Sequence, residues 1–313
     1  MKNLKLFTGI VAAGLLLSAC SSSSDDDNGK KAVKSGYKVE HVHGLAYTKD
    51  DSIYMASHEG LIQTNNQGGD WNFVGGVDFD FMGFHVQSDG TMLTSGHPGP
   101  LSDLPNPLGL MESKNNGEKW ESKSLVGEVD FHVLTSNDSN PDLLFGVIQM
   151  ESGKYESGIY KSTDKGENWE KIKANGLPED LHGVYSLISL PSDKNVLLSG
   201  TNAGVLRSED GGETWKNVDN TRLITALGTI PGTSNLISYS IIENDAGIMI
   251  SKDNGVTWEN IGLNLGQDAA AYIAINPEDA DKLAVVTFEN NLLISEDGGK
   301  NWETLMDKGT LKN

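Results

Sequence analysis

Short apolar runs separated by turn residues recur along this chain from about residue 41 onward. The clearest set is an apolar run over 183–190, a second at 195–199 after a Pro-Ser-Asp-Lys turn, a third at 204–208 and a fourth at 214–218. A similar quartet lies at 271–275, 282–287, 291–295 and 301–305. Short apolar runs bounded by turn residues predict strands. Because helical periodicity is almost absent after the N-terminal segment, the pattern predicts an all-β protein.

An eight-residue motif lies between the third and fourth strands of each unit. It reads Ser or Thr, any residue, Asp or Asn, any, Gly, any two, Trp, and it occurs six times, at 64–71, 113–120, 162–169, 208–215, 251–258 and 295–302. In such a turn the Asp or Asn side chain can accept backbone N–H groups, the Gly can take a positive φ, and the Trp can pack between sheets. These structural positions are Asn66, Asn115, Asp164, Asp210, Asp253, Asp297, Trp71, Trp120, Trp169, Trp215, Trp258 and Trp302.

The spacing of the motif defines the architecture. Successive tryptophans are 49, 49, 46, 43 and 44 residues apart, which is the length of one four-stranded propeller blade. We therefore predict a six-bladed β-propeller of four-stranded antiparallel blades over residues 37–311, with units that begin near residues 41, 81, 131, 183, 225 and 271. The last unit has four strands of its own, so residues 37–40 are expected to add at most a short edge pairing.

The N-terminus carries a separate signal. Lysines within residues 1–5 precede an apolar run over 6–17, which is typical of a secretory signal peptide and too short for a transmembrane helix. The ending Leu17-Ser18-Ala19-Cys20 resembles the bacterial lipoprotein box, which implies that Cys20, the only cysteine, becomes the lipidated first residue of the mature protein. The alternative is an ordinary signal peptide with an incidental thiol.

Residues 20–36 are polar and contain too few apolar side chains to fold, so they predict a disordered tether. The predicted organisation is a signal peptide at 1–19, the lipidated cysteine and tether at 20–36, and the propeller at 37–311. We expect a protein anchored to the bacterial cell membrane through Cys20, on the extracytoplasmic side.

The net charge of −20 narrows the range of partners. A surface this acidic disfavours nucleic acid, because no basic stripe is available to bind phosphates. It is compatible with neutral glycans, cations or basic proteins. We expect a monomer with a glycan or protein partner.

Strand order assigns the candidate chemistry to one side of the propeller. The turns between first and second strands and between third and fourth strands lie on the face that carries all six motifs, which we call the motif face. The other connections lie on the opposite face, where propellers usually bind ligands. All seven histidines of the chain are expected to point toward the central channel or this opposite face.

The histidines predict a ligand site. The candidate ligand-binding residues are His43, His58, His85, His97, His132 and His182. Neutral imidazoles that converge from several strands are good ligands for zinc or copper, and the candidate metal ligands are His43, His58, His85 and His132. The alternative is that the inner strands only hydrogen-bond these histidines in a polar, watery channel.

Carboxylates on the same face are candidates for catalysis. The candidate catalytic residues are Glu59, Asp80 and Asp130. A glycoside hydrolase needs two carboxyl groups roughly 5 to 10 Å apart. The candidate aromatic platforms for a glycan are Phe79, Phe81, Phe84 and Tyr155. In a chain this acidic, the favoured interpretation of each single carboxylate is a solvated loop acid, and that of each phenylalanine is a core residue.

The motif resembles the Asp-box, or bacterial neuraminidase repeat. The span 37–311 is similar to the Asp-box propellers of sialidase-like and xyloglucanase-like glycoside hydrolases, of sortilin and of the photosystem II assembly factors. It looks most like bacterial lipoproteins of this superfamily that are labelled glycosylhydrolases. They share His-Gly-Leu at the first strand, which in this chain is His43-Gly44-Leu45, and Ser-His-acidic-Gly-Leu after the second, which is residues 57–61. The resemblance implies a class and no mechanism.

The resemblance to sialidases does not extend to their chemistry. Sialidases clamp the substrate carboxylate with three arginines, and this chain has only Arg207 and Arg222. Two hypotheses remain. The favoured one is a membrane-tethered binding or assembly module with a ligand site, in which zinc or copper is the candidate cofactor, on the face opposite the motifs. The alternative is a glycoside hydrolase that acts on a neutral extracellular or cell-wall glycan.

Overall fold

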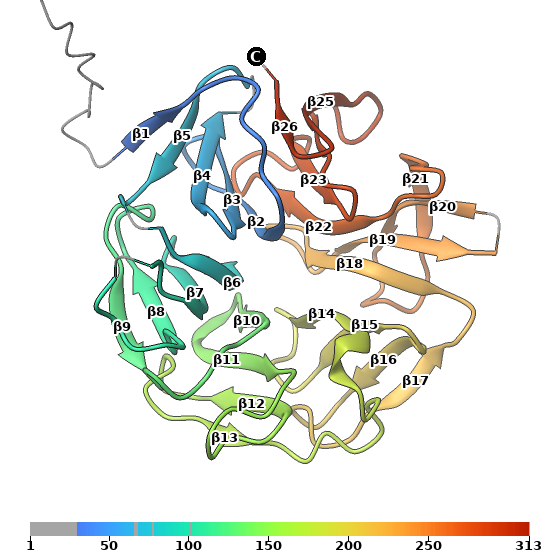
Figure 1. Cartoon of the computed structure of the whole chain (residues 1–313). Helices are drawn as coiled ribbons and strands as arrows, with labels where there is room; N and C mark the ends of the chain where they lie inside the picture. The colour runs from blue at the N-terminus through green and yellow to red at the C-terminus, as the bar shows by residue number, and fades with distance from the viewer. Residues whose placement is uncertain (1–29, 66–67, 77, 101, 244, 313) are drawn as a thin grey trace, which may run out of the picture.

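The computed structural model describes residues 30–65, 68–76, 78–100, 102–243 and 245–312. They form six antiparallel sheets arranged in a ring (Figure 1). Four consecutive strands pair in chain order within each sheet, so the predicted six-bladed β-propeller is confirmed. One 3-10 turn, η1 (Leu181–Gly183), precedes the fourth blade. No helix in these ranges is long and apolar enough to cross a membrane.

Blades one to three occupy the N-terminal half of the ring. Their strands, from the centre outward, are β2 (Val42–Tyr47), β3 (Ser52–Ser57), β4 (Gly60–Asn65) and β5 (Trp71–Val74) in blade one; β6 (Asp80–Val86), β7 (Met92–His97), β8 (Leu110–Ser113) and β9 (Glu121–Ser124) in blade two; and β10 (Val133–Asn137), β11 (Asn140–Ile148), β12 (Gly158–Ser162) and β13 (Glu170–Lys171) in blade three.

Blades four to six complete the ring. Their strands are β14 (Val184–Ser189), β15 (Leu197–Thr201), β16 (Gly204–Ser208) and β17 (Lys216–Asp219) in blade four; β18 (Leu223–Thr229), β19 (Leu236–Ile242), β20 (Asp245–Ser251) and β21 (Glu259–Gly262) in blade five; and β22 (Ala270–Ile275), β23 (Leu283–Thr287), β24 (Leu292–Ser295) and β25 (Glu303–Asp307) in blade six. In blades four and six these bounds differ from the predicted ones by at most two residues.

The second strand of a blade is the most deeply buried. Every residue of β3, β15 and β23 is buried, which means that both faces of each strand are covered by neighbouring sheets. This explains why they read in the sequence as continuous apolar runs instead of alternating ones.

The motif forms the same turn in every copy that the structure describes in full. In blade four the Ser208 hydroxyl accepts the N–H of Gly212 at 2.9 Å and donates to Asp210 Oδ1 at 2.8 Å. Asp210 in turn accepts the N–H of Thr214 at 2.9 Å, and Gly212 takes a φ of +96°. Hydrogen bonds from the Thr214 side chain and backbone lower the pKa of Asp210 to about 2. The hydroxyl groups of Ser113, Ser162, Ser251 and Ser295 bind their glycines in the same way.

Each motif tryptophan packs against one of the six clusters of buried apolar residues. In four motifs its indole N–H also donates to the carbonyl of the motif glycine, for example from Trp215 to Gly212 at 2.8 Å. The predicted structural role of the motif therefore has a physical basis in the turn and in the packing. Asn66, the polar residue of the first motif, lies outside the described residues.

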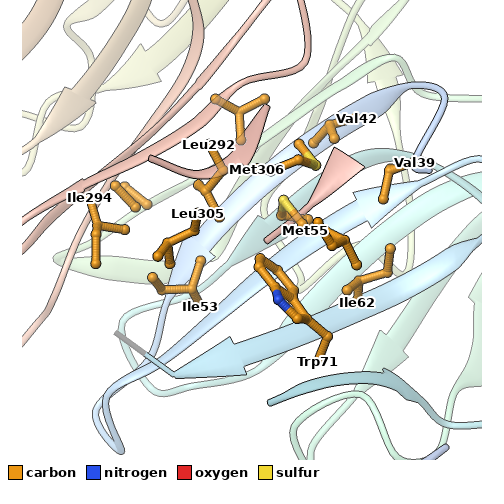
Figure 2. Packing of buried hydrophobic residues seen from close by; sticks show 14 of the residues in the cluster. Val39, Val42, Ile53, Met55, Ile62, Trp71, Leu292, Ile294, Leu305 and Met306 are labelled. Carbon is orange, nitrogen blue, oxygen red and sulfur yellow. The ribbon is translucent and has the colours of Figure 1, made fainter. Parts of the chain in front are cut away.

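The ring closes between blades six and one. A short strand, β26 (Thr310–Leu311), pairs with β25, and residues 36–39 pair with β26 on its other side. Gly36 donates to Leu311 O and Leu311 donates to Tyr37 O, both at 3.0 Å. Figure 2 shows the buried apolar cluster of this seam, to which Val39, Trp71, Leu305 and Met306 belong. The expected edge pairing of residues 37–40 is thus confirmed.

The predicted tether is too long at its C-terminal end. Residues 30–33, assigned to the disordered stretch 20–36, form β1 (Lys30–Val33), which pairs with β5 as a fifth strand at the outer edge of blade one. The error arose because this segment is stabilised by backbone pairing, which its polar sequence does not reveal. The predicted signal peptide and Cys20 lie outside the described residues.

We predict that Ser208→Ala lowers the free energy of unfolding by about 1–3 kcal/mol. Ser208 is buried, and the substitution leaves the N–H of Gly212 without its partner. Urea unfolding followed by tryptophan fluorescence measures the change. Ser208→Thr is the matched control and should remain close to the wild type, since Thr64 holds this position in the first motif. An alanine variant as stable as the threonine variant would contradict the assigned role.

Candidate functional site

Polar residues from three adjacent blades meet on the opposite face, where the first strand of a blade begins and the second ends. Antiparallel pairing brings these ends together: Asp80, at the start of β6, is the register partner of His97, at the end of β7. We call the resulting group the histidine–carboxylate cluster. Its members are His41, His43, His58, Glu59, Asp80, His97, Asp130 and His132.

The first part of the cluster joins blades one and two. One ligand atom each from His43, His58 and Asp80 lies within 4.8 Å of the other two. The rings of His43 and His58 stack with centroids 4.6 Å apart, and His58 Nε2 is 3.7 Å from Asp80 Oδ1. His41, which was not among the predicted ligands, lies beside them with its ring centroid 5.0 Å from that of His58. The His-x-His spacing of His41 and His43 is the sequence feature that could have identified His41 as a member of the site.

The second part of the cluster joins blades two and three. Asp130 Oδ2 is 3.4 Å from His97 Nε2 and 3.6 Å from His132 Nδ1. The other ring nitrogen of His97, Nδ1, lies 2.7 Å from Asn106 Oδ1. This contact places Asn106, from the proline-rich segment that follows His97, against the cluster.

Several buried polar atoms of the cluster have no hydrogen-bond partner within the described part of the chain. They are His43 Nε2, Glu59 Oε2, Asp80 Oδ1, Asp130 Oδ1 and His132 Nδ1. The second oxygen of Glu59 is used, because it accepts the N–H of Glu40 at 3.0 Å. A buried polar atom without a partner costs about 1–3 kcal/mol, so five in one place mark a site suited to a ligand.

Burial and mutual charge shift the pKa values of the cluster. Burial lowers the pKa of His43 to about 4, and the neighbouring His58 and His41 contribute to the decrease. Burial also raises the pKa of Asp80, against the effect of His58 and His97. Interaction with Asp130 raises the pKa of His97 to about 9. At neutral pH His43 is therefore a neutral imidazole, the form that binds metal ions.

The donor set fits a transition metal. Two imidazoles and a carboxylate are ligands that zinc accepts, and imidazole also suits copper. Zinc ligands in a tetrahedral site lie about 3.4 Å from one another, given bond lengths of 2.0–2.2 Å. The separation of 3.7 Å between His58 Nε2 and Asp80 Oδ1 needs only a small adjustment to reach that value.

Two predicted ligands lie apart from this group. His85 forms part of the wall of the channel, where its Nε2 contacts the Ser136 hydroxyl at 2.8 Å and accepts the N–H of Ser136 at 3.2 Å. Burial lowers the pKa of His85 to about 4, consistent with this acceptor role. His182 lies in η1, exposed, with Nδ1 2.8 Å from Asp180 Oδ1. The four predicted metal ligands are therefore not brought together as one group.

The candidate aromatic platforms are largely buried. Phe79, Phe81 and Phe84 belong to the core between blades one and two. Tyr155 packs edge-on against Tyr160, with Lys154 Nζ 5.2 Å from its ring centre. None of the three phenylalanines is available to stack on a sugar.

A cavity of about 1000 Å³ follows the central channel. Its wall includes His43 and His132 at one end, and Tyr185 and Tyr272 from blades four and six. It extends to the turns of the motif face, such as those at 48–50 and 231–234. The cavity is therefore not confined to the opposite face, where the sequence predicts the binding site, but continues through the channel to the motif face.

Comparisons with known proteins agree with this architecture. The family model for Sortilin-Vps10 (sortilin, neurotensin receptor 3) matches residues 203–310, about a third of the chain. No curated protein matches the chain.

Solved structures with the same fold cover most of the chain. The GH74 enzyme of Niastella koreensis has a TM-score of 0.61 at 15% identity, covering 87% of this chain and 46% of its own. The GH74 xyloglucanase of Xanthomonas campestris has a TM-score of 0.53 at 16% identity, with coverages of 88% and 46%. YCF48 bound to D1 peptide has a TM-score of 0.51 at 16% identity, with coverages of 89% and 86%. The chain spans less than half the length of the two GH74 enzymes, and at these identities the likeness shows the propeller fold alone.

Proposed function

We propose that this protein is a metal-binding module in which His43, His58 and Asp80 hold a zinc or copper ion on the face opposite the motifs. The observation that carries the proposal is the approach of their three ligand atoms to within 4.8 Å of one another. His43 Nε2 and Asp80 Oδ1, two atoms able to bind a metal, are buried and have no hydrogen-bond partner among the described residues. A metal ion would satisfy both.

The arrangement of the ligands favours a metal that binds a partner over a metal with a purely structural role. Structural zinc sites have four protein ligands, whereas three ligands leave a position for water or a bound group. His58 is 39% exposed, so a partner on the opposite face can approach this position. A protein or glycan partner supplies suitable oxygen or nitrogen donors. YCF48, a structure with the same fold, has been solved with D1 peptide bound, which supports the proposal that a peptide segment is the partner here.

The proposal includes attachment to the membrane through a lipidated Cys20. Lys30, the first described residue, pairs with Val74, so the chain enters the fold at the opposite-face end of blade one. The ten residues from Cys20 to Lys30 reach at most about 35 Å. The short reach would keep the cluster near the bilayer and within the extracytoplasmic space.

A glycoside hydrolase is the second candidate. Burial raises the pKa of Asp80, and Asp130 contributes to the increase, as the general acid of a carboxylate pair requires. The GH74 structures supply a fold precedent. The buried phenylalanines count against this function, because they leave only Tyr155 of the four aromatic platforms expected from the sequence.

We predict that the purified full chain binds zinc and that His58→Ala weakens binding by more than about 100-fold, the upper range for loss of an outer-shell partner alone. Isothermal titration calorimetry of zinc into the protein in detergent measures the affinity. His182→Ala is the matched control, since this exposed histidine lies outside the cluster. Equal affinity in the wild type and His58→Ala, or no zinc binding in either, would contradict the proposal.

Assays on neutral glycans, including xyloglucan, are expected to release no reducing sugar, because the protein binds and does not hydrolyse. The assay should include Asp80→Asn, Asp130→Asn and a chelator-treated sample. Turnover that survives chelation and falls by about 10²–10⁴-fold in either variant would establish the hydrolase and reject the metal-binding module as the main function.

Cell fractionation tests the anchor. The wild-type protein should sediment with membranes, and Cys20→Ala should move to the soluble extracytoplasmic fraction, because the acyl chains are lost. Ser21→Ala, at the adjacent position, serves as the control and should stay with the membranes. If Cys20→Ala sediments as the wild type does, the lipid anchor is refuted.

A further inference from the structure

The central channel is hollow, and apolar side chains from all six blades line it. Its volume of about 1000 Å³ lies at the upper end of the range for small-molecule sites, about 300–1000 Å³. Each blade contributes an aliphatic side chain from its first strand, the innermost one. These side chains are Leu45, Val86, Val133, Leu187, Leu227 and Ile273. All of them except Leu187 are only half-buried, so their exposed surface faces the channel.

Charged side chains line only one end of the channel. Within the described ranges, every Asp, Glu and Lys of the wall lies in a turn between a first and a second strand, on the motif face. These residues are Lys49, Asp50, Asp89, Asp138 and Glu278. Burial lowers the pKa of His85, which also lines the channel, to about 4, so its imidazole carries no charge at neutral pH. A charged ligand would lose its hydration inside the channel without gaining a partner of opposite charge, so the wall favours an uncharged molecule.

The opposite-face end of the channel has an aromatic entrance. Tyr185, near the start of β14, lines the cavity, and the ring of Phe288 packs edge-on against it with centroids 6.5 Å apart. Phe288 lies in the turn between β23 and β24 and is 56% exposed. Its backbone N–H donates to Ala269 O at 3.0 Å, which holds the turn in place. The two rings therefore form an apolar surface that continues from the opposite face into the channel.

The first strands set the length of the channel. β14 has six residues, which at about 3.3 Å per residue gives a length of about 20 Å. A ligand that covers the aliphatic side chains of all six blades is therefore elongated. Removal of these side chains from water would favour its binding. A saccharide fits this part of the wall poorly, because the aliphatic side chains offer its hydroxyl groups no hydrogen-bond partners.

We infer that the channel is a second binding site, which takes one elongated, uncharged molecule with an apolar body, such as a long-chain alcohol, through the opposite face. The inference goes beyond the proposed function and uses other residues. Of the three proposed metal ligands, only His43 belongs to the described channel wall. The ligand would therefore lie beside the metal without depending on it.

Binding of N-phenylnaphthylamine, an uncharged apolar dye whose fluorescence rises in apolar surroundings, tests the inference. The dye is titrated without detergent into the full chain carrying Cys20→Ala, which has no thiol to acylate. We expect saturable binding of one dye molecule per chain, with displacement by decanol and no displacement by maltose. A signal that does not saturate, or displacement by maltose, would overturn the inferred ligand class.

Two variants test whether the dye occupies the channel. Gly228 lines the cavity, and a Cβ at this position would meet only Ile237 Cγ2, at 3.7 Å, so Gly228→Leu should fold and fill part of the channel. It should weaken dye binding by at least about tenfold. Phe288→Ala should weaken it by about fivefold, because the entrance loses its exposed ring. Val256→Ala is the matched control, since it removes an exposed apolar side chain from a motif turn and should leave the dye affinity unchanged.

The remaining outcomes separate the channel site from the metal site. Circular dichroism checks that Gly228→Leu is folded, and if it is not, Phe288→Ala decides, because its ring is exposed. Unchanged dye affinity in either folded variant would overturn the inference. His58→Ala should lose zinc affinity and retain the dye. Zinc binding without dye binding would overturn the channel site alone, and dye binding without zinc binding would overturn the metal site alone.

Discussion

Every blade of this propeller depends on having a neighbour on both sides. The second strands, such as β3 and β23, are buried along their whole length, so a sheet that lost one neighbour would expose apolar surface at about 25 cal/mol for each Å². Closure of the ring gives each of the six sheets both of its neighbours. Closure also fixes the strand ends that carry His43, Asp80 and His97, because the packing between sheets holds these ends in place.

Most of the fold could be predicted because its signals are local. Serine, glycine and tryptophan at fixed spacing define one turn, as Ser208, Gly212 and Trp215 do. The number of such motifs, six, equals the number of blades. The closure was harder to predict. Strand β1 and residues 36–39 are held by backbone hydrogen bonds to distant segments, and each is too short to show a repeating pattern of apolar residues, so the sequence does not reveal the pairing.

The sequence was sufficient to predict which face of the propeller carries the site, but not which side chains come together there as ligands. Strand order was sufficient to place the histidines of the cluster on one side, at the ends of strands such as β6 and β7 where Asp80 and His97 are register partners. It could not show that His85 uses its Nε2 to bind Ser136 of the next blade, or that His182 bonds to Asp180. Nor could it show that Asp80 and Asp130, chosen as catalytic candidates, lie within ion-pair distance of histidines. Side-chain direction and contacts between blades decide these points, and both are tertiary properties.

The seam between blades six and one sets an order of events during synthesis. Residues 36–39 pair with residues 309–311, and the indole of Trp71 donates to the carbonyl of Lys312 at 2.8 Å. The C-terminal partners of residues 36–39 leave the ribosome some 270 residues after the segment that needs them. Until then the apolar residues of blade one that face the seam, including Ile53 and Ile62, lack the cover that blade six provides. The growing chain therefore exposes apolar surface early and for a long time, which makes the first blade the part most in need of a chaperone.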